Sequence, residues 1–353
     1  MFRSKRTSLL KRLWKQRVTE HEASCPSQSS QDIDLKSVLN SMLKRLKEGQ
    51  LEVLSQAVET KGADKTPCVL LPKEDIRSGR LTAPPHFLCC QVWRWPDLDP
   101  SQQLKKLPCC TAGDQTQVCC NPYHWSRLYA PDCPPPSYTE ALQERVKPLE
   151  DPEASVVSTE TGGTPSELRL TYITGDTLSS GGHGMHWCHI AYWELRQRVG
   201  RLFSVFKETV NIFQELPHGD GMCLGVLQRE TPASDSVKRT RNKVGIGVTL
   251  SKEGDGVWLY NRSEYPVFVN SPTLDPPCVR TLMVHKVLPG YAVKMFDYDL
   301  SHLLEQTRRP TSDGPYNPNS IQISFAKGWG PSYSRQFITS CPCWIEVLLN
   351  VKR

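Results

Sequence analysis

The residues best suited to chemistry are cysteines gathered in one stretch of the chain. Eight of the 14 cysteines lie between Cys68 and Cys133. No apolar run approaches the roughly 18 residues of a membrane span, and no apolar segment follows the basic N-terminus as it would in a signal peptide. We therefore expect an intracellular chain, where clustered cysteines are more often metal ligands than disulfides.

Part of this stretch fits a zinc site. Zinc prefers four thiolate and imidazole ligands, and a Cys3His set leaves no position for water, so such a site is structural. The candidate ligands are Cys68, Cys110, Cys119 and His124. The cysteine doublets leave alternatives open, because Cys90, Cys109 or Cys120 could replace a neighbour. These residues could also be small buried thiols without a metal.

A proline-rich motif follows the cysteines. The segment Pro134-Pro-Pro-Ser-Tyr138 contains a PPxY signature, formed by Pro135, Pro136 and Tyr138. Consecutive prolines hold an extended conformation that docks into the aromatic groove of a WW domain. The alternative is an ordinary proline-rich hinge.

Two basic segments lie farther along the chain. Lys238–Lys243 carries four cations, and Lys327–Arg335 is a Gly-rich segment with two cations and two aromatic residues. Arginine clusters recognise phosphorylated or acidic segments through paired hydrogen bonds, so these segments are candidate partner-binding elements. Solvated charge patches are the alternative. The candidate contact residues are Arg239, Arg241, Lys243, Lys327, Trp329 and Arg335.

Other charge does not indicate a particular partner. The formal net charge is +6, but seven cations precede the first acid, Glu20, and the remainder is nearly neutral. In the basic N-terminal segment, Leu9, Leu10, Leu13 and Trp14 stand at helical spacing, so it could be an amphipathic helix that serves as a nuclear-localisation patch or contacts an anionic surface; the alternative is a solvated tail. No nucleophile or phosphate-binding loop stands in a recognisable frame, so we expect a binding protein and not an enzyme.

The elements that must position these residues fall into separate regions. We expect a basic tail at 1–30, a first domain at 31–128, a flexible linker at 129–185 and a second domain at 186–353. In the first domain, apolar residues at helical spacing predict helices over Leu35–Leu46 and Leu51–Val58. The second domain alternates short apolar runs with turns, which predicts a β-sandwich. The predicted strands include Val199–Phe206, Val244–Leu250, Gly256–Asn261 and Cys343–Leu349.

Both regions carry motifs of one family. Cys90–Leu98 and Val118–His124 resemble hallmarks of the Mad homology 1 (MH1) domain, whereas Gly256–Arg262, Ser324–Gly330 and Ser340–Trp344 resemble the Mad homology 2 (MH2) domain. Together they resemble the Smad family. The resemblance implies an α+β fold with two domains: a zinc-stabilised MH1-like domain and an MH2 β-sandwich, SMAD/FHA-like, flanked by helices and loops. It also implies one structural Zn²⁺ held by the four candidate ligands.

Within the family the chain resembles the inhibitory members, because of its opening at Met1–Arg6 and the stretch Phe325–Pro331. In receptor-activated members, a basic β-hairpin reads DNA. Here Gly79-Arg-Leu81 is followed directly by Thr82–Pro85. We expect the next strand to begin almost immediately after these residues. A shortened hairpin with two prolines makes direct DNA binding doubtful.

The resemblance also implies a function. The sequence ends at Arg353 without the Ser-x-Ser tail of receptor-activated members, so we expect a protein that occupies a receptor without being activated. The implied role is to antagonise signalling by the transforming growth factor β (TGF-β) superfamily, mainly its bone morphogenetic protein branch. The implied partners are type I receptors, phosphorylated Smads and WW-domain ubiquitin ligases, in nucleus and cytoplasm. The alternative is a nuclear zinc-containing corepressor tethered to DNA-bound partners.

Overall fold

The computed structural model describes residues 5–18, 28–78, 81–113, 116–129, 185–215, 220–274, 283–307 and 317–350. The predicted linker falls almost wholly outside the described residues, as do the chain termini. We describe the two domains on either side of it separately. No helix of the described residues is both long enough and apolar enough to cross a membrane.

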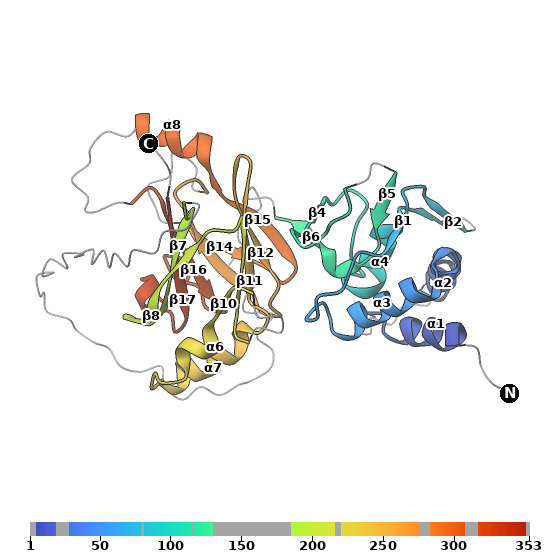
Figure 1. Ribbon diagram of the computed structural model, residues 1–353, viewed down its shortest axis with the longest axis horizontal. Coiled ribbons are helices and arrows are strands. Elements are labelled where there is room, and N and C mark those ends of the chain that lie inside the picture. Colours follow the sequence, from blue (N-terminus) through green and yellow to red (C-terminus); the bar gives the residue numbers. More distant parts are fainter. Residues whose placement is uncertain are drawn as a thin grey trace, which may run out of the picture. The chain divides into compact units, whose positions relative to one another are not determined.

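The first domain combines helices with short strands (Figure 1). Its elements in chain order are α1 (Lys5–Lys15), α2 (Gln28–Arg45), α3 (Glu48–Glu59), β1 (Leu70–Pro72), β2 (Ile76–Ser78), β3 (Leu81–Ala83), α4 (Pro85–Trp93), β4 (Leu104–Lys106), β5 (Gln117–Cys119), the 3-10 helix η1 (Pro122–His124) and β6 (Trp125–Leu128). The antiparallel strand pairs are β1 with β5, β2 with β3 and β4 with β6. The two predicted helices correspond to α2 and α3.

The basic N-terminal segment contributes to the core of this domain. Leu9 and Leu13 of α1 are buried, and the Leu13 carbonyl accepts a hydrogen bond from Trp93 Nε1 at 3.0 Å. The guanidinium of Arg6 donates to the carbonyls of Leu43 and Leu46 at the end of α2. A cation at that position satisfies free carbonyls and complements the helix dipole. Residues 5–15 therefore form a packed amphipathic helix and not a solvated tail.

A second correction concerns the segment after the hairpin, where we expected a strand. Pro85 instead begins helix α4, with Pro84 as the residue before it. A proline in the first turn of a helix loses no intrahelical hydrogen bond, and its fixed φ suits a helix start. The prolines that exclude a ladder strand thus also begin a helix.

The second domain is a β-sandwich with short helices. Its elements are β7 (Cys188–Glu194), β8 (Gln197–Val205), β9 (Thr209–Phe213), β10 (Met222–Cys223), α6 (Leu224–Gln228), α7 (Asp235–Val244), β11 (Val248–Glu253), β12 (Gly256–Asn261), β13 (Val267–Asn270), β14 (His285–Val287), β15 (Tyr291–Asp297), α8 (Tyr298–Thr307), β16 (Ser320–Phe325), η2 (Ile338–Ser340) and β17 (Trp344–Leu349).

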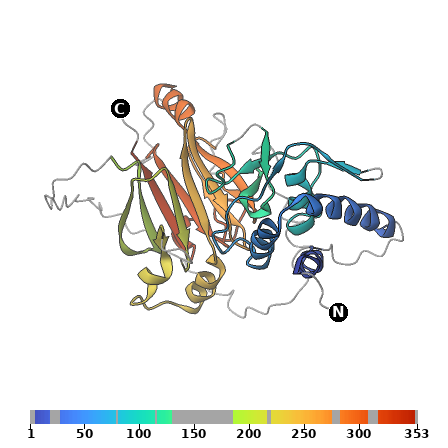
Figure 2. The ribbon, with the colours of Figure 1, turned by 45° about the vertical axis from the view of Figure 1, so that its right-hand side comes forward.

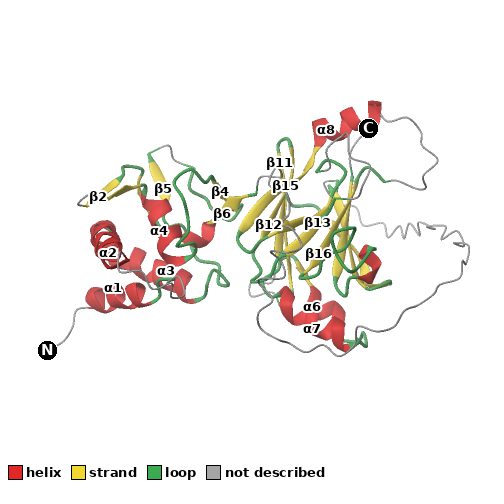
Figure 3. Cartoon of the chain, turned by 180° about the vertical axis from the view of Figure 1, so that it is seen from behind, coloured by secondary structure: helices red, strands yellow, loops and turns green. Residues whose placement is uncertain are grey.

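Its two sheets face each other (Figure 2). One sheet has the order β14-β13-β16-β17-β7-β8, and the other contains β10-β9-β11-β12-β15. Apolar residues from both sheets meet in one buried cluster, which includes Ile190, Leu250, Leu259, Ile323 and Ile345. Figure 3 shows α6 and α7 at one end of the sandwich and α8 at the other.

Helix α7 occupies a segment whose last residue we expected in a strand. The predicted strand Val244–Leu250 is only partly correct, because Val244 ends α7 and β11 begins at Val248. Gly245 follows the helix with a φ of 55°, a conformation that favours glycine and ends helices. The cations of Lys238–Lys243 therefore lie on a helix.

Candidate metal centre and basic surface

The four predicted metal ligands meet in the first domain. Their ligand atoms all lie within 4.8 Å of one another. Cys119 ends β5 and His124 ends η1, whereas Cys68 precedes β1 and Cys110 follows β4. The thiols of Cys68 and Cys119 each lie 3.5 Å from His124 Nδ1, and the Cys68 and Cys110 sulfurs are 3.8 Å apart. The group could hold a metal ion.

The surroundings of His124 determine which nitrogen faces the thiols. His124 Nε2 lies 3.1 Å from the carbonyl of Thr66. A carbonyl only accepts, so Nε2 carries the proton and Nδ1 keeps its lone pair toward the sulfurs. Asn121 supports the same loop, because it donates to Thr66 Oγ1 at 2.8 Å and accepts from the Tyr123 amide. Such outer contacts orient a metal-binding histidine.

The thiols interact strongly with one another. A hydrogen bond with Cys119 lowers the pKa of Cys110 to about 4. The same hydrogen bond raises the pKa of Cys119, and burial adds to that rise. A bound cation would favour the thiolate form of all three cysteines, since thiolates are the metal-binding species.

The alternative cysteines lie elsewhere. Cys120 and Cys90 are buried in the apolar core, where their thiols face the carbonyls of Val118 and Pro122. Cys109 is exposed and does not belong to the ligand group. Cys119 ends β5 and Cys120 follows it, and side chains of consecutive residues in extended backbone point to opposite sides, so Cys119 reaches the group and Cys120 does not.

The hairpin of the first domain is short. Strands β2 and β3 have three residues each. In receptor-activated members, according to the resemblance, this place holds a basic hairpin for reading DNA. Residues 79–80, between these strands, lie outside the described part, and the doubt about direct DNA binding stays a prediction.

In the second domain, both predicted basic segments lie near one end of a sheet. The segment 326–343 connects β16 to β17, and the turn between β7 and β8 lies at the same end because Trp344 pairs with Trp193 and with Ser324. Helix α7 is tied there as well, since Cys343 Sγ lies 3.8 Å from the carbonyl of Val237. Antiparallel pairing therefore gathers segments that are far apart in sequence.

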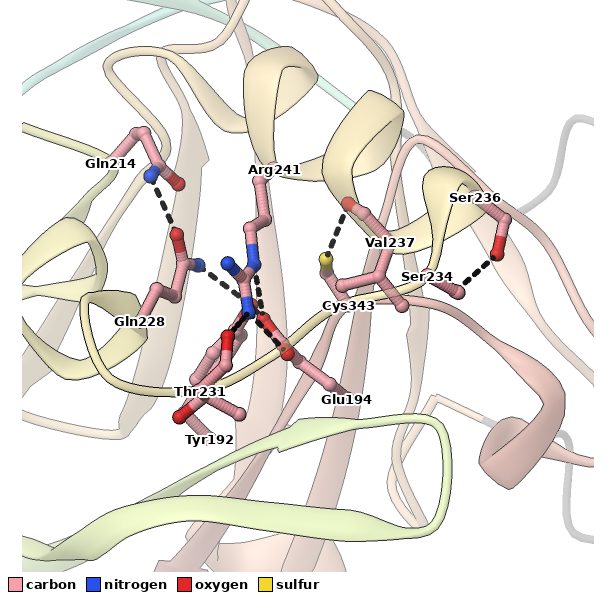
Figure 4. A network of polar contacts seen from close by, with 10 residues as sticks. All are labelled: Tyr192, Glu194, Gln214, Gln228, Thr231, Ser234, Ser236, Val237, Arg241 and Cys343. Atoms are coloured by element: carbon pink, nitrogen blue, oxygen red, sulfur yellow. Dashed lines mark hydrogen bonds and ion pairs between the residues drawn. The ribbon is translucent and has the colours of Figure 1, made fainter.

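Arg241 of α7 faces inward (Figure 4). It makes two hydrogen bonds of 2.7 Å to the carboxylate of Glu194, whose side chain is only 5% exposed. Tyr192 donates to the same carboxylate at 2.7 Å and accepts from Gln228 at 2.8 Å. The bond to Glu194 also raises the pKa of Arg241. The structure thus gives Arg241 an intramolecular partner, which was not expected from the sequence.

The other cations of α7 differ from Arg241 in exposure. Arg239 is exposed, and Lys243 is half-buried with its ammonium 5.4 Å from the ring centroid of Tyr265. Both lie on the helix that Arg241 anchors. The anchored arginine therefore fixes the backbone from which these two cations project.

The Gly-rich segment has a firm internal support. Trp329 is 1% exposed and packs in a cluster with Phe268, Ile338 and Trp344. The carbonyl of Lys327 accepts from Ser324 Oγ at 2.7 Å, and the Arg335 carbonyl accepts from the Gly330 amide at 2.7 Å. Trp329 thus supports the loop from within, whereas Lys327 and Arg335 are half-buried.

Sequence reasoning missed Glu194 and the residues around it. A signal for α7 was present, because Val237, Thr240 and Val244 are buried at helical spacing after Ser234. That periodicity also places Arg241 toward the buried side. No comparable signal identified Glu194 as its partner. The predicted WW-binding residues Pro135, Pro136 and Tyr138 lie outside the described residues.

Comparisons with known proteins agree with this organisation. Residues 35–129 match the MH1 domain family and residues 185–350 match the MH2 domain family. Mothers against decapentaplegic homolog 6 of Gallus gallus is 51% identical over 328 residues, which cover 91% of this chain and 76% of that protein. Mothers against decapentaplegic homolog 7 of Homo sapiens is 44% identical over 337 residues, with 90% and 79% coverage.

A solved structure of the Interferon Regulatory Factor 9 IAD domain aligns with 47% of this chain and 83% of its own. The TM-score is 0.32 at 15% identity, which is too weak to support an argument.

Proposed function

The chain belongs to the Smad family, in its inhibitory branch. We propose that it antagonises TGF-β superfamily signalling, mainly the bone morphogenetic protein branch, and that it does so by occupying activated type I receptors. The matched families are signalling domains and not enzymes. The observation that supports the proposal most directly is the pair of basic segments on fixed supports at one end of the sandwich.

The chemistry of that surface fits a phosphorylated segment. A phosphoserine carries nearly two negative charges at neutral pH and offers three acceptor oxygens. Arginine binds such groups through paired hydrogen bonds, and nearby lysines add charge. Arg239, Lys243, Lys327 and Arg335 are the cations that would supply these contacts. The same surface would bind phosphorylated Smads.

Charge reversal tests the surface. We expect the full chain with Lys327→Glu and Arg335→Glu to lose binding to the phosphorylated kinase domain of a type I receptor. Matched reversals at the exposed Lys207 and Lys252, outside both basic segments, should leave binding intact. Retained binding by the first variant would contradict the proposal. Transcriptional repression that persists without receptor binding would favour the alternative function, a nuclear corepressor tethered to DNA-bound partners.

We also propose that Pro135, Pro136 and Tyr138 recruit a WW-domain ubiquitin ligase to the receptor. The motif in the sequence supports this proposal. Tyr138→Ala should weaken binding to the ligase's WW domains, whereas Tyr172→Ala, outside the motif, should not. Equal binding by both variants would exclude the motif.

We propose that the metal of the Cys3His group is Zn²⁺ and that its role is structural. All four positions of a tetrahedral site would be taken by protein ligands. The ion would join the segment before β1 to β5 and η1. We further propose that the protein occupies both nucleus and cytoplasm, which imaging of the tagged chain would test.

A further inference from the structure

The turn between β7 and β8 is bonded to α7 and to residues that follow the Gly-rich basic segment. Glu194, the last residue of β7, holds Arg241 of α7 (Figure 4). The next residue, Leu195, donates its amide to the carbonyl of Cys341 at 3.2 Å and accepts from Trp344 Nε1 at 2.8 Å. The turn is therefore a rigid part of this surface.

Leu195 has an unusual backbone conformation. Its φ is 54°, in the left-handed region that glycine and asparagine adopt most easily. Its side chain is 37% exposed, so it is not required to fill the core. A leucine held in a strained conformation at an exposed turn suggests a functional use of its side chain.

Phe337 exposes a second apolar side chain nearby. It is 70% exposed, the highest fraction among the exposed large apolar residues of the described part of the chain. Phe337 precedes η2, and the Ser340 amide donates to its carbonyl at 3.0 Å. Cys341, which accepts the Leu195 bond, follows this single turn, so the Phe337 and Leu195 backbones lie on the order of 10 Å apart.

Cations flank both apolar residues. Arg196, exposed, follows Leu195 directly, and Arg335 stands two positions before Phe337. A second copy of this chain would bring like charges together, which disfavours self-association through this face. An acidic partner has the complementary charge.

We infer that Leu195 and Phe337 form an apolar anchor site within the basic surface, which binds a large apolar side chain beside the phosphorylated or acidic residues of a partner segment. The inference rests on the proposed function and adds to its recognition chemistry. A few residues near the centre of an interface, often aromatic, commonly contribute most of the binding energy.

The two kinds of contact respond differently to salt. Attraction between exposed charges is screened as ionic strength rises, whereas apolar burial is not. Loss of the anchor should therefore weaken binding at both low and high salt. Loss of an exposed cation should matter most at low salt.

The experiment measures affinity of the full chain for the phosphorylated kinase domain of a type I receptor at about 0.1 M and about 0.5 M salt. We expect Phe337→Ala to weaken binding about tenfold or more at both salt concentrations. Leu195→Gly and Leu195→Asn should each weaken it severalfold without lowering the thermal midpoint, because both residues tolerate a positive φ. Leu202→Ala and Leu288→Ala, each 41% exposed, are the matched controls and should bind normally.

The outcomes separate this inference from the proposed function. Unchanged affinity of the Leu195 and Phe337 variants, together with loss by Lys327→Glu and Arg335→Glu, overturns the anchor alone. If only the Leu195 and Phe337 variants lose affinity, the apolar anchor is supported and the proposed role of the basic residues is overturned. Normal binding by every variant overturns both.

Discussion

In the first domain no described strand exceeds four residues, whereas β8 of the second domain has nine. The first domain surrounds its thiol–imidazole group with short strands and loops. The second joins two sheets through a large apolar cluster and needs no comparable group among its described residues. Short elements bury little apolar surface each, so a metal can supply the stability that their packing lacks.

Each domain also contains a polar group that brings distant segments together. In the first it is the Cys3His group, which joins loops that have little regular structure. In the second it is the ion pair of Glu194 and Arg241, which fastens a helix onto a sandwich already held by apolar packing. We therefore expect damage to the first to unfold a domain and damage to the second to loosen one element.

The largest expected effect is loss of the metal. If the group binds Zn²⁺ as we propose, chelation or Cys119→Ser should remove the ion and unfold the first domain, because structural zinc contributes on the order of 10 kcal/mol in small domains. Metal analysis and hydrogen exchange across residues 28–129 would measure this. Cys109→Ser is the control, since Cys109 lies outside the ligand group. Full protection from hydrogen exchange in the metal-free protein would show that the first domain does not depend on the metal.

The next effect is loss of the buried ion pair. Arg241→Ala leaves the Glu194 carboxylate buried without its partner, which should cost about 3–5 kcal/mol of unfolding free energy. The double variant Glu194→Gln with Arg241→Met should recover part of this loss. Denaturant unfolding of the second domain measures both. A single variant as stable as the wild type would show that the pair does not fasten α7.

A smaller expected effect is a loss of folding stability at low pH, caused by His86. Burial, with repulsion from Lys106 and Lys73, lowers the pKa of His86 from 6.5 to about 4. The unfolded chain therefore binds this proton more readily, so stability is complete above pH 6.5 and falls as the pH drops toward 4. The loss is at most about 3 kcal/mol. His86→Phe should remove this part of the pH dependence, which the difference between variant and wild-type unfolding would show.

The smallest effect concerns an exposed ion pair. Lys207 and Asp220 are 3.3 Å apart, with side chains 76% and 65% exposed. Lys207→Ala should change stability by less than about 1 kcal/mol, because water and salt weaken such pairs. The same unfolding experiment as for Arg241→Ala would compare the two pairs. Equal losses of unfolding free energy for Lys207→Ala and Arg241→Ala would show that burial does not determine how much an ion pair contributes to stability.

The residue types of the metal ligands and the close pair Cys119 and His124 were predictable from sequence, because ligand type and short spacing are local properties. The spacing of Cys119 and His124 and the nearby cysteines predicted the ligand set. The choice within each doublet was left open. The tertiary structure decides it: Cys110 and Cys119 belong to the ligand group, whereas Cys109 is exposed and Cys120 lies in the apolar core.

Two segments show why other predictions were incomplete. We expected a strand after Pro85, yet the same prolines that exclude ladder hydrogen bonding allow a helix to begin. We took the cations of α7 as similar candidates for partner contact. The helix turns Arg241 toward Glu194 and leaves Arg239 exposed, so one helix carries cations with different roles.

By itself, the sequence determined the family, the two-domain division and the residue types of both candidate sites, because motifs, composition and periodicity are properties of the chain. The tertiary structure decided which residues meet. Cys68 and His124 are 56 positions apart, and Glu194 and Arg241 are 47 apart. Contacts at such separations depend on how whole elements pack, which no local pattern specifies.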